Sequence, residues 1–212
     1  MRIKNTGLFL QHKWVDLKNI LLASHALPSQ TRKERKLYRK ILLENSYHDP
    51  MRILEWGAGM STIYFSKYLA DLRVNYEWHA IDNDPRWHGR ITHWVNHLAM
   101  GGRVKVHLRE NPEEYVNLPE SLGMFNIILI DGRFRRRCLG IAKRVLRTGG
   151  IVILHDAQRQ HYHCGMAGYG KQQFFDGGKW YPTQNPRSMV WIGSDPDNEN
   201  AYLRTCFDSA EV

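Results

Sequence analysis

The chain has 212 residues, enough for one well-developed hydrophobic core. Hydrophobic residues make up 42% and charged residues 24%, ordinary values for a globular protein, and no apolar run approaches the ~18 residues of a membrane-spanning helix. The three cysteines form no CxxC pair, which argues against a disulfide framework or a zinc ribbon. Polar residues interrupt the apolar stretch near the amino terminus, so no signal peptide is predicted and we expect a soluble, cytoplasmic protein.

The net charge is +9, from 30 basic and 21 acidic side chains. This excess favours acidic partners, namely nucleic acid, phosphorylated or carboxylated small molecules, or an anionic surface. The charge does not choose among these partners, and a general contribution to solubility explains it as well.

Residues 1–50 are predicted to form a helical amino-terminal extension. Trp14, Leu17 and Leu21 fall at helical spacing, and Pro28 follows the end of that helix. A second helix is predicted over 31–45, with an apolar stripe and an opposite face of six basic residues: Arg32, Lys33, Arg35, Lys36, Arg39 and Lys40.

Residues 51–212 are predicted to form one domain in which strands and helices alternate. Such alternation is typical of an α/β fold, with a mostly parallel sheet covered by helices on both faces. Two further strands, before and after the prolines at 182 and 186, predict an antiparallel carboxy-terminal hairpin at the sheet edge, giving seven strands in all. The predicted parallel strands are 51–55, 76–81, 103–108, 125–131 and 151–154, and the helices between them are 61–70, 85–100 and a basic helix ending near 147.

A glycine loop follows the first predicted strand of this domain. Gly57 and Gly59 allow backbone angles closed to other residues and let a ligand approach the main chain. Ser61 or Thr62 is placed to cap the next helix. An ordinary strand-to-helix turn would look the same, so a second element is needed to identify a ligand site.

The second predicted strand of the domain ends in Asp82. An acidic residue at this position of a nucleotide-binding sheet accepts both ribose hydroxyls. The alternative is a helix cap, but Asp84 stands directly before Pro85 and suits that purpose better. Asp82 is therefore the candidate ribose ligand.

The pattern E-x-G-x-G-x-S, the strand ending in an acid, FNIILIDGR and LRTGGIVILHD together resemble the class I S-adenosylmethionine (SAM) dependent methyltransferases over about residues 51–193. The resemblance implies a Rossmann-like fold and SAM as cofactor. It implies that the loop with Glu55, Gly57, Gly59 and Ser61 holds the methionine part of SAM, that Asp82 binds the ribose, and that Glu110 and its neighbours Arg109 and Asn111 lie near the adenine. A Rossmann dehydrogenase would have a third glycine where this chain has Thr62.

Acidic residues also end the two most apolar strands, at Asp131 and at His155-Asp156. The carboxyl ends of strands form the ligand crevice of such folds, so these three residues are the candidate catalytic bases. A structural role for His155 is the alternative. In the similar catechol-type O-methyltransferases, strand-end acids hold a divalent metal. Asp131 and Asp156 match two of those positions, but Ala157 stands at the third, so no metal ligands are assigned.

The motifs Ile130-Asp131-Gly132-Arg133 and His155-Asp156-x-x-Arg159-x-x-Tyr162 resemble the glucuronoxylan 4-O-methyltransferases and their bacterial relatives. That resemblance implies methylation of a hydroxyl on a uronic acid and makes Arg133, Arg159 and Tyr162 candidate substrate-binding residues. A carboxylate or phosphate of the acceptor would pair with arginine. A solvated helix face is the alternative for the basic cluster at 133–137.

Two other histidine groups suggest a metal. His161, His163 and Cys164 match no standard zinc spacing, and a polar loop over the acceptor explains them. His93 and His97 lie four residues apart on a helix, but no HExxH accompanies them, so they are expected at its surface.

The principal hypothesis is an O-methyltransferase acting on a small or saccharide-like, anionic acceptor. An RNA methyltransferase that docks RNA on the basic amino-terminal helix is the second hypothesis. A SAM-binding protein without methyl transfer is the third. The sequence names neither the acceptor nor the oligomeric state.

Overall fold

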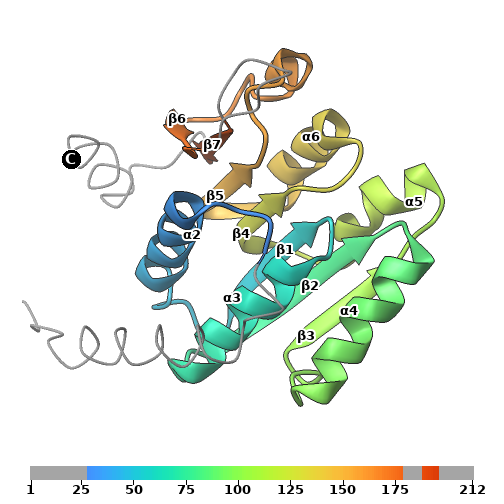
Figure 1. The fold of residues 1–212 in the computed structure, drawn as a ribbon. Coiled ribbons are helices and arrows are strands. Elements are labelled where there is room, and N and C mark those ends of the chain that lie inside the picture. The colour runs from blue at the N-terminus through green and yellow to red at the C-terminus, as the bar shows by residue number, and fades with distance from the viewer. Residues whose placement is uncertain (1–27, 179–187, 196–212) are drawn as a thin grey trace, which may run out of the picture.

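The computed structural model describes residues 28–178 and 188–195. Its centre is a seven-stranded sheet in the order β3-β2-β1-β4-β5-β7-β6, in which β1 to β5 are parallel and β6 and β7 are antiparallel to their neighbours (Figure 1). The predicted sheet, including its closing hairpin, is confirmed. The strands are β1 Met51–Trp56, β2 Tyr76–Asp82, β3 Val104–Leu108, β4 Phe125–Ile130, β5 Leu146–Leu154, β6 Gln172–Asp176 and β7 Met189–Ser194.

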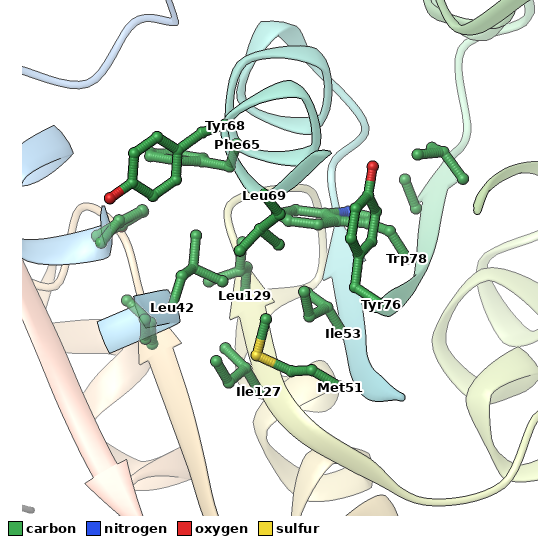
Figure 2. Packing of buried hydrophobic residues seen from close by; sticks show 14 of the residues in the cluster. Leu42, Met51, Ile53, Phe65, Tyr68, Leu69, Tyr76, Trp78, Ile127 and Leu129 are labelled. Carbon is green, nitrogen blue, oxygen red and sulfur yellow. The ribbon is translucent and has the colours of Figure 1, made fainter. Parts of the chain in front are cut away.

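Helices cover both faces of the sheet, and each face has its own hydrophobic core. The helices are α2 Arg32–Glu44, α3 Met60–Asp71, α4 Pro85–His97, α5 Pro112–Asn117 and α6 Arg135–Val145, with 3-10 helices η1 Leu118–Ser121 and η2 Gln160–Gly165. One core lies between the sheet and α2, α3 and α4; the other lies between the sheet and α5 and α6. Figure 2 shows the first, a single cluster that contains Phe65 and Leu69 of α3 together with Ile53 and Ile127 of the sheet.

Helix α2 confirms the helix predicted over 31–45. Thr31 caps it in a capping box, because the Thr31 hydroxyl accepts from the Glu34 backbone N–H and the Glu34 carboxylate accepts from the Thr31 N–H. Tyr38, Ile41 and Leu42 belong to the same core as the sheet. The described part of the predicted extension, residues 28–50, therefore packs against the sheet through α2. The helix predicted around Trp14 to Leu21, and the strand residues predicted at 179–181, lie outside the described residues.

Three local differences from the predicted elements concern the site. Helix α5 was not predicted, because the segment after β3 carries too few apolar residues to show a periodicity; Asn111 caps it and Pro112 begins it. Strand β5 begins at Leu146, before the glycines that were expected to precede it. The loop 158–173, expected only as a polar loop over the acceptor, contains the buried Met166 and Tyr169, and the Tyr169 hydroxyl donates to Leu139 O of α6. The loop is thus anchored to α6.

No helix within the described ranges has the length and apolar character needed to span a membrane.

Candidate functional site

A cavity of about 780 Å³ opens at the carboxyl ends of the parallel strands. It lies where β1 and β4 are neighbours, which is the point at which the strand order reverses. Ligands of open α/β sheets bind at such switch points. The cavity is lined by the segment before α2 (Ser29, Gln30), the glycine loop and start of α3 (Gly57, Ala58, Gly59, Met60, Ser61), the end of β2 and start of α4 (Asp82, Asn83, Asp84, Trp87), Tyr115, and the ends of β4 and β5 (Asp131, Gly132, Arg133, Arg135, His155, Asp156).

Gly57 is required by the geometry of the loop. Its φ is +96°, a left-handed value that favours glycine, and its N–H donates to Ile81 O of β2 (2.8 Å). A Cβ at Gly57 would lie 2.6 Å from the Cα of Gly132. The two glycines therefore allow the loops after β1 and β4 to touch, and this contact forms the floor of the cavity.

Glu55 does not line the cavity. Its carboxylate is buried beneath the loop and accepts hydrogen bonds from Ser61 Oγ (2.5 Å), Thr62 Oγ1 (2.5 Å) and Trp78 Nε1 (3.0 Å). Burial raises the pKa of Glu55 to about 7, although these three hydrogen bonds act against the rise. Through these hydrogen bonds the Glu55 carboxylate links β1 to β2 and to the first turn of α3. Its predicted direct contact with a cofactor remains a prediction.

Asp84 has its predicted role as a helix cap, and Asp82 lies at the cavity. Asp84 caps α4 by accepting from the N–H groups of Arg86 (2.8 Å) and Trp87 (3.2 Å). Asp82 lines the cavity at the end of β2, with one oxygen accepting from the Asp84 N–H (2.8 Å). Burial raises the pKa of Asp82, and the backbone N–H groups that it accepts from act against this.

Asp131 and His155 meet because adjacent strands end in register. Ile130 of β4 pairs with Leu154 of β5, so the next residue of each strand reaches the same edge of the sheet. His155 Nδ1 donates to Asp131 Oδ1 at 3.0 Å. Asp156 follows with a left-handed φ of 57° and places a carboxylate oxygen 3.7 Å from His155 Nδ1. The structure therefore brings together the three residues that the sequence proposed as catalytic.

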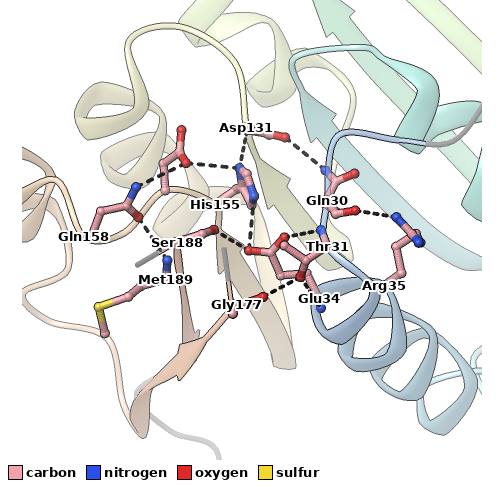
Figure 3. Close-up of polar contacts among 12 residues, drawn as sticks. Gln30, Thr31, Glu34, Arg35, Asp131, His155, Gln158, Gly177, Ser188 and Met189 are labelled. Carbon is pink, nitrogen blue, oxygen red and sulfur yellow. Dashed lines mark hydrogen bonds and ion pairs between the residues drawn. The ribbon is translucent and has the colours of Figure 1, made fainter. Parts of the chain in front are cut away.

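Two residues from the segment around the start of α2 complete this cluster (Figure 3). Gln30 Nε2 donates to Asp131 Oδ2 (3.1 Å). Glu34 Oε1 lies 3.5 Å from His155 Nε2 and accepts from the Ser188 hydroxyl (2.5 Å). Sequence reasoning did not assign either residue to the site. The capping-box spacing of Thr31 and Glu34 was visible, but it indicates only a helix start.

The cluster holds His155 as an imidazolium at neutral pH. Burial lowers the pKa of His155, but the carboxylates of Asp131, Glu34 and Asp156 outweigh burial and raise it to about 10. Burial likewise raises the pKa of Glu34, but hydrogen bonds from His155, Ser188 and Thr31 bring it down to about 2. His155 in this state donates hydrogen bonds and has no lone pair with which to accept a proton, which argues against its predicted role as a general base.

Arg135 is an arginine whose side chain is buried at the site. Arg133, a candidate substrate-binding residue from the sequence, lines the cavity with an exposed side chain. Arg135 is 9% exposed and its guanidinium forms ion pairs with Asp131 (3.1 Å) and Asp156 (3.3 Å). The guanidinium carbon of Arg135 lies over the aromatic ring of Tyr162, 5.6 Å from the ring centroid.

The other predicted site residues lie at the rim or beyond it. Arg159 is largely exposed and pairs with Asp156 (3.2 Å). Tyr162 is half-buried beneath Arg135 and borders a smaller pocket of about 410 Å³. Glu110 is exposed and does not line the main cavity. His163 Nε2 contacts Ala157 O (2.8 Å), and among the described residues no metal-ligand cluster includes His161, His163 or Cys164. His93 and His97 are exposed on α4, as predicted.

Comparison with known proteins agrees with this arrangement. Residues 54–157, just under half of the chain, match the profile of a family described as "Methyltransferase domain". The match runs from β1 to the residue after Asp156. Among curated protein sequences, none is significantly similar to the chain.

Several solved structures share the fold at low sequence identity. An O-methyltransferase from Bacillus cereus, solved in complex with SAH, is 13% identical with a TM-score of 0.63, over 92% of this chain and 93% of that chain. A SAM-dependent O-methyltransferase from Thermotoga maritima is 11% identical with a TM-score of 0.58, over 85% and 71%. A precorrin-6y C5,15-methyltransferase from Geobacter metallireducens is 15% identical with a TM-score of 0.54, over 74% and 87%.

The fold is that of the class I methyltransferases. The match of residues 54–157 to the methyltransferase-domain family and the shared fold both support a SAM-dependent methyltransferase enzyme. The cavity suits this cofactor, because its volume lies in the range of small-molecule sites and Asp82 offers a carboxylate for two ribose hydroxyls. Gly59 also leaves space for a ligand beside the loop. A Cβ built at this position would have Ser61 Oγ, at 3.5 Å, as its nearest neighbour.

Proposed function

We propose that the enzyme transfers the methyl group of SAM to a hydroxyl of a small or saccharide-like, anionic acceptor. The observation that carries the proposal is the single cavity that runs from Asp82, the candidate ribose ligand, to the cluster of Asp131, His155 and Asp156. Bound SAM supplies an electrophilic methyl group. The chain must then align an acceptor oxygen with it and take up the hydroxyl proton.

Asp131 is our candidate for the residue that receives this proton. Its side chain is 21% exposed, the most accessible of the three carboxylates around His155. Hydrogen bonds from Gln30 and His155 fix both of its oxygens. With SAM bound, the acceptor oxygen would form the new bond to the methyl carbon, the carbon–sulfur bond would break with its electron pair on sulfur, and the hydroxyl proton would pass to Asp131. His155, already protonated, orients the Asp131 carboxylate.

Candidate cofactor contacts come from the other half of the cavity. The loop residues Gly57, Gly59 and Ser61 would hold the methionine part of SAM and Asp82 its ribose. Glu55 would act through Ser61, whose hydroxyl it binds at 2.5 Å. Glu110 would contact the adenine only if the segment after β3 closed over the cavity.

The anionic character of the acceptor rests on arginine. Arg133 lines the cavity with an exposed side chain, and it has the geometry to bind a carboxylate with two parallel hydrogen bonds. Arg159 and Tyr162 stand at the same end. The resemblance to the glucuronoxylan 4-O-methyltransferases points to a uronic acid as the acceptor, and the Bacillus and Thermotoga neighbours, both O-methyltransferases, agree with an oxygen acceptor.

Asp131→Asn tests the proposal. The amide keeps the shape of the side chain but accepts a proton far less readily, so SAM affinity measured by calorimetry should change less than about threefold while methylation of glucuronic-acid-bearing xylo-oligosaccharides falls at least ~10²-fold. Asp71→Asn, on an exposed carboxylate that pairs with Lys67, is the matched control. Full activity of Asp131→Asn would refute the assignment. Equal turnover of acidic and neutral oligosaccharides would refute the anionic acceptor.

A further inference from the structure

The carboxyl ends of β4 and β5 offer a set of groups that would ordinarily attract a divalent cation. Asp131, His155 and Asp156 each present one ligand atom, and these atoms lie within 4.8 Å of one another. Carboxylate oxygens and imidazole nitrogens are suitable ligands for Mg²⁺, Mn²⁺ or Zn²⁺. Catechol-type O-methyltransferases, which this chain resembles, hold their metal with strand-end acids.

The guanidinium of Arg135 already lies between these groups. Nη2 pairs with Asp131 Oδ1 at 3.1 Å, and Nη1 pairs with Asp156 Oδ2 at 3.3 Å. These two nitrogens and Nε also donate to backbone carbonyls at the strand ends: Nη2 to Asp131 O (2.8 Å), Nη1 to His155 O (2.6 Å) and Nε to Gly132 O (2.9 Å). A planar fork with five donors suits this arrangement, which a lysine could not reproduce.

The local backbone explains why this arginine reaches back beneath the strands. Phe134 takes a left-handed φ of 53°, so the chain turns sharply and α6 begins at Arg135. The side chain then folds under the ends of β4 and β5, above the ring of Tyr162. Arg136 and Arg137, one and two residues later, are more exposed, and Arg137 pairs instead with Glu113.

The remaining ligands do not fit a metal either. His155 Nδ1 donates to Asp131, and metal binding would require the imidazole to lose its proton although three carboxylates surround it. Ala157 stands where the third acid is expected. A divalent ion would also have to displace, or lie against, a buried guanidinium.

We propose that Arg135 is the built-in cation of the active site, which holds the strand-end carboxylates in place of a divalent metal. Arg135 is thus a positioning residue that acts through Asp131 and Asp156. The proposal concerns the site to which the methyl-transfer function is assigned, but its test needs no acceptor, so either can fail without the other.

The experiment measures Mn²⁺ and Mg²⁺ binding by calorimetry and thermal unfolding, with the full-length protein after treatment with EDTA. The wild type should show no saturable binding and no stabilisation at about 1 mM metal, a concentration that reveals dissociation constants well below it. Arg135→Gln removes the guanidinium from between Asp131 and Asp156, so its unfolding midpoint should fall and Mn²⁺ should raise it again. Arg136→Gln, at an exposed neighbour, is the matched control and should behave as the wild type.

Saturable Mn²⁺ or Mg²⁺ binding at this site in the wild type would overturn the proposal. A folded Arg135→Gln protein that Mn²⁺ does not stabilise would overturn it too, because the guanidinium and the metal would not be interchangeable. If Arg135→Gln does not fold, Arg135→Lys retains the charge without the planar fork; it should fold with reduced stability and still bind no Mn²⁺, and metal binding by that variant would count against the proposal.

Discussion

Glu34 Oε1 lies 3.5 Å from His155 Nε2, so a helix that precedes the matched methyltransferase segment contacts the imidazolium at the centre of the site. The same carboxylate accepts from Ser188, just before β7, and from the Thr31 N–H. Glu34 is 2% exposed. One buried carboxylate thus joins α2, β5 and the carboxy-terminal hairpin, and the site is incomplete without the segment before residue 54.

Glu34→Gln is expected to lower the pKa of His155, because it removes one of the carboxylates that keep the imidazole protonated. In the wild type this ion pair contributes stability that is fully present below the ordinary histidine pKa and is lost as pH rises through about 10. The variant should therefore lose less stability than the wild type between pH 7 and pH 10. At pH 7 it should be less stable by ~1–3 kcal/mol.

Two measurements check this prediction: NMR titration of the His155 ring, and urea unfolding as a function of pH. Glu114→Gln, at an exposed carboxylate on α5, is the control and should leave both unchanged. An unaltered His155 titration in Glu34→Gln would contradict the assigned contact, whereas a loss of stability alone would indicate only a structural role.

Glu55 also predicts that stability depends on pH, but here burial raises the pKa of a carboxyl group, whereas carboxylates raise the pKa of the histidine. Its pKa is raised from 4.5 to about 7 in the folded protein, so between these values the folded state keeps a proton that the unfolded state has lost. The stability contribution is therefore greatest below pH 4.5, declines as pH rises to about 7, and is flat above. Glu55→Gln should flatten this decline, by up to about 3 kcal/mol. Urea unfolding at intervals from pH 5 to pH 8 measures it, and an unchanged slope would contradict the burial-driven shift.

The two loop glycines predict different responses to the same substitution. Gly57→Ala places a Cβ 2.6 Å from Gly132 Cα and adds a left-handed alanine, so we expect a loss of several kcal/mol and of SAM binding. Gly59→Ala is the matched control, because its φ of −157° suits any residue and its Cβ would meet nothing closer than 3.5 Å. Thermal unfolding separates the two. Equal stability of the two variants would show that the contact between Gly57 and Gly132 accommodates a Cβ more easily than the 2.6 Å distance indicates.

Much of this architecture was predictable because it depends on local patterns. The alternation of apolar strands and helices predicted the sheet, and the ends of adjacent parallel strands predicted that Asp131, His155 and Asp156 would lie together. Asp84 was recognised as a cap from the proline that follows it.

The contacts that were not predicted depend on features that no local sequence pattern encodes. Glu34 reaches Ser188 across 154 positions of the chain, and its capping-box role concealed that contact. Arg133 lines the cavity as expected, but no local pattern predicted that the left-handed turn at Phe134 directs Arg135 into the site as well. Glu55 was interpreted as a cofactor ligand from its motif; its buried hydrogen bonds with Ser61 and Thr62 were not predicted, and its contact with the cofactor remains a prediction.

The basic face of α2 allows the RNA hypothesis to be tested directly. Several of its cations already have partners within the protein: Arg35 donates to Gln30 O (2.5 Å), and Arg39 lies over the ring of Tyr68 (5.7 Å). Arg32, Lys33 and Lys36 are exposed. A docking arm would use these three to neutralise phosphates.

Since we assign a small anionic acceptor, we expect that replacing Arg32, Lys33 and Lys36 together with glutamine weakens RNA binding no more than replacing the exposed Arg86, Arg103 and Arg147. Fluorescence anisotropy with single-stranded RNA over a series of salt concentrations measures this, because each lost phosphate contact reduces the slope of log K against log salt by roughly 0.7. A selective reduction of the slope by about 2 in the α2 variant, with the control unchanged, would favour RNA as the acceptor and displace the saccharide assignment.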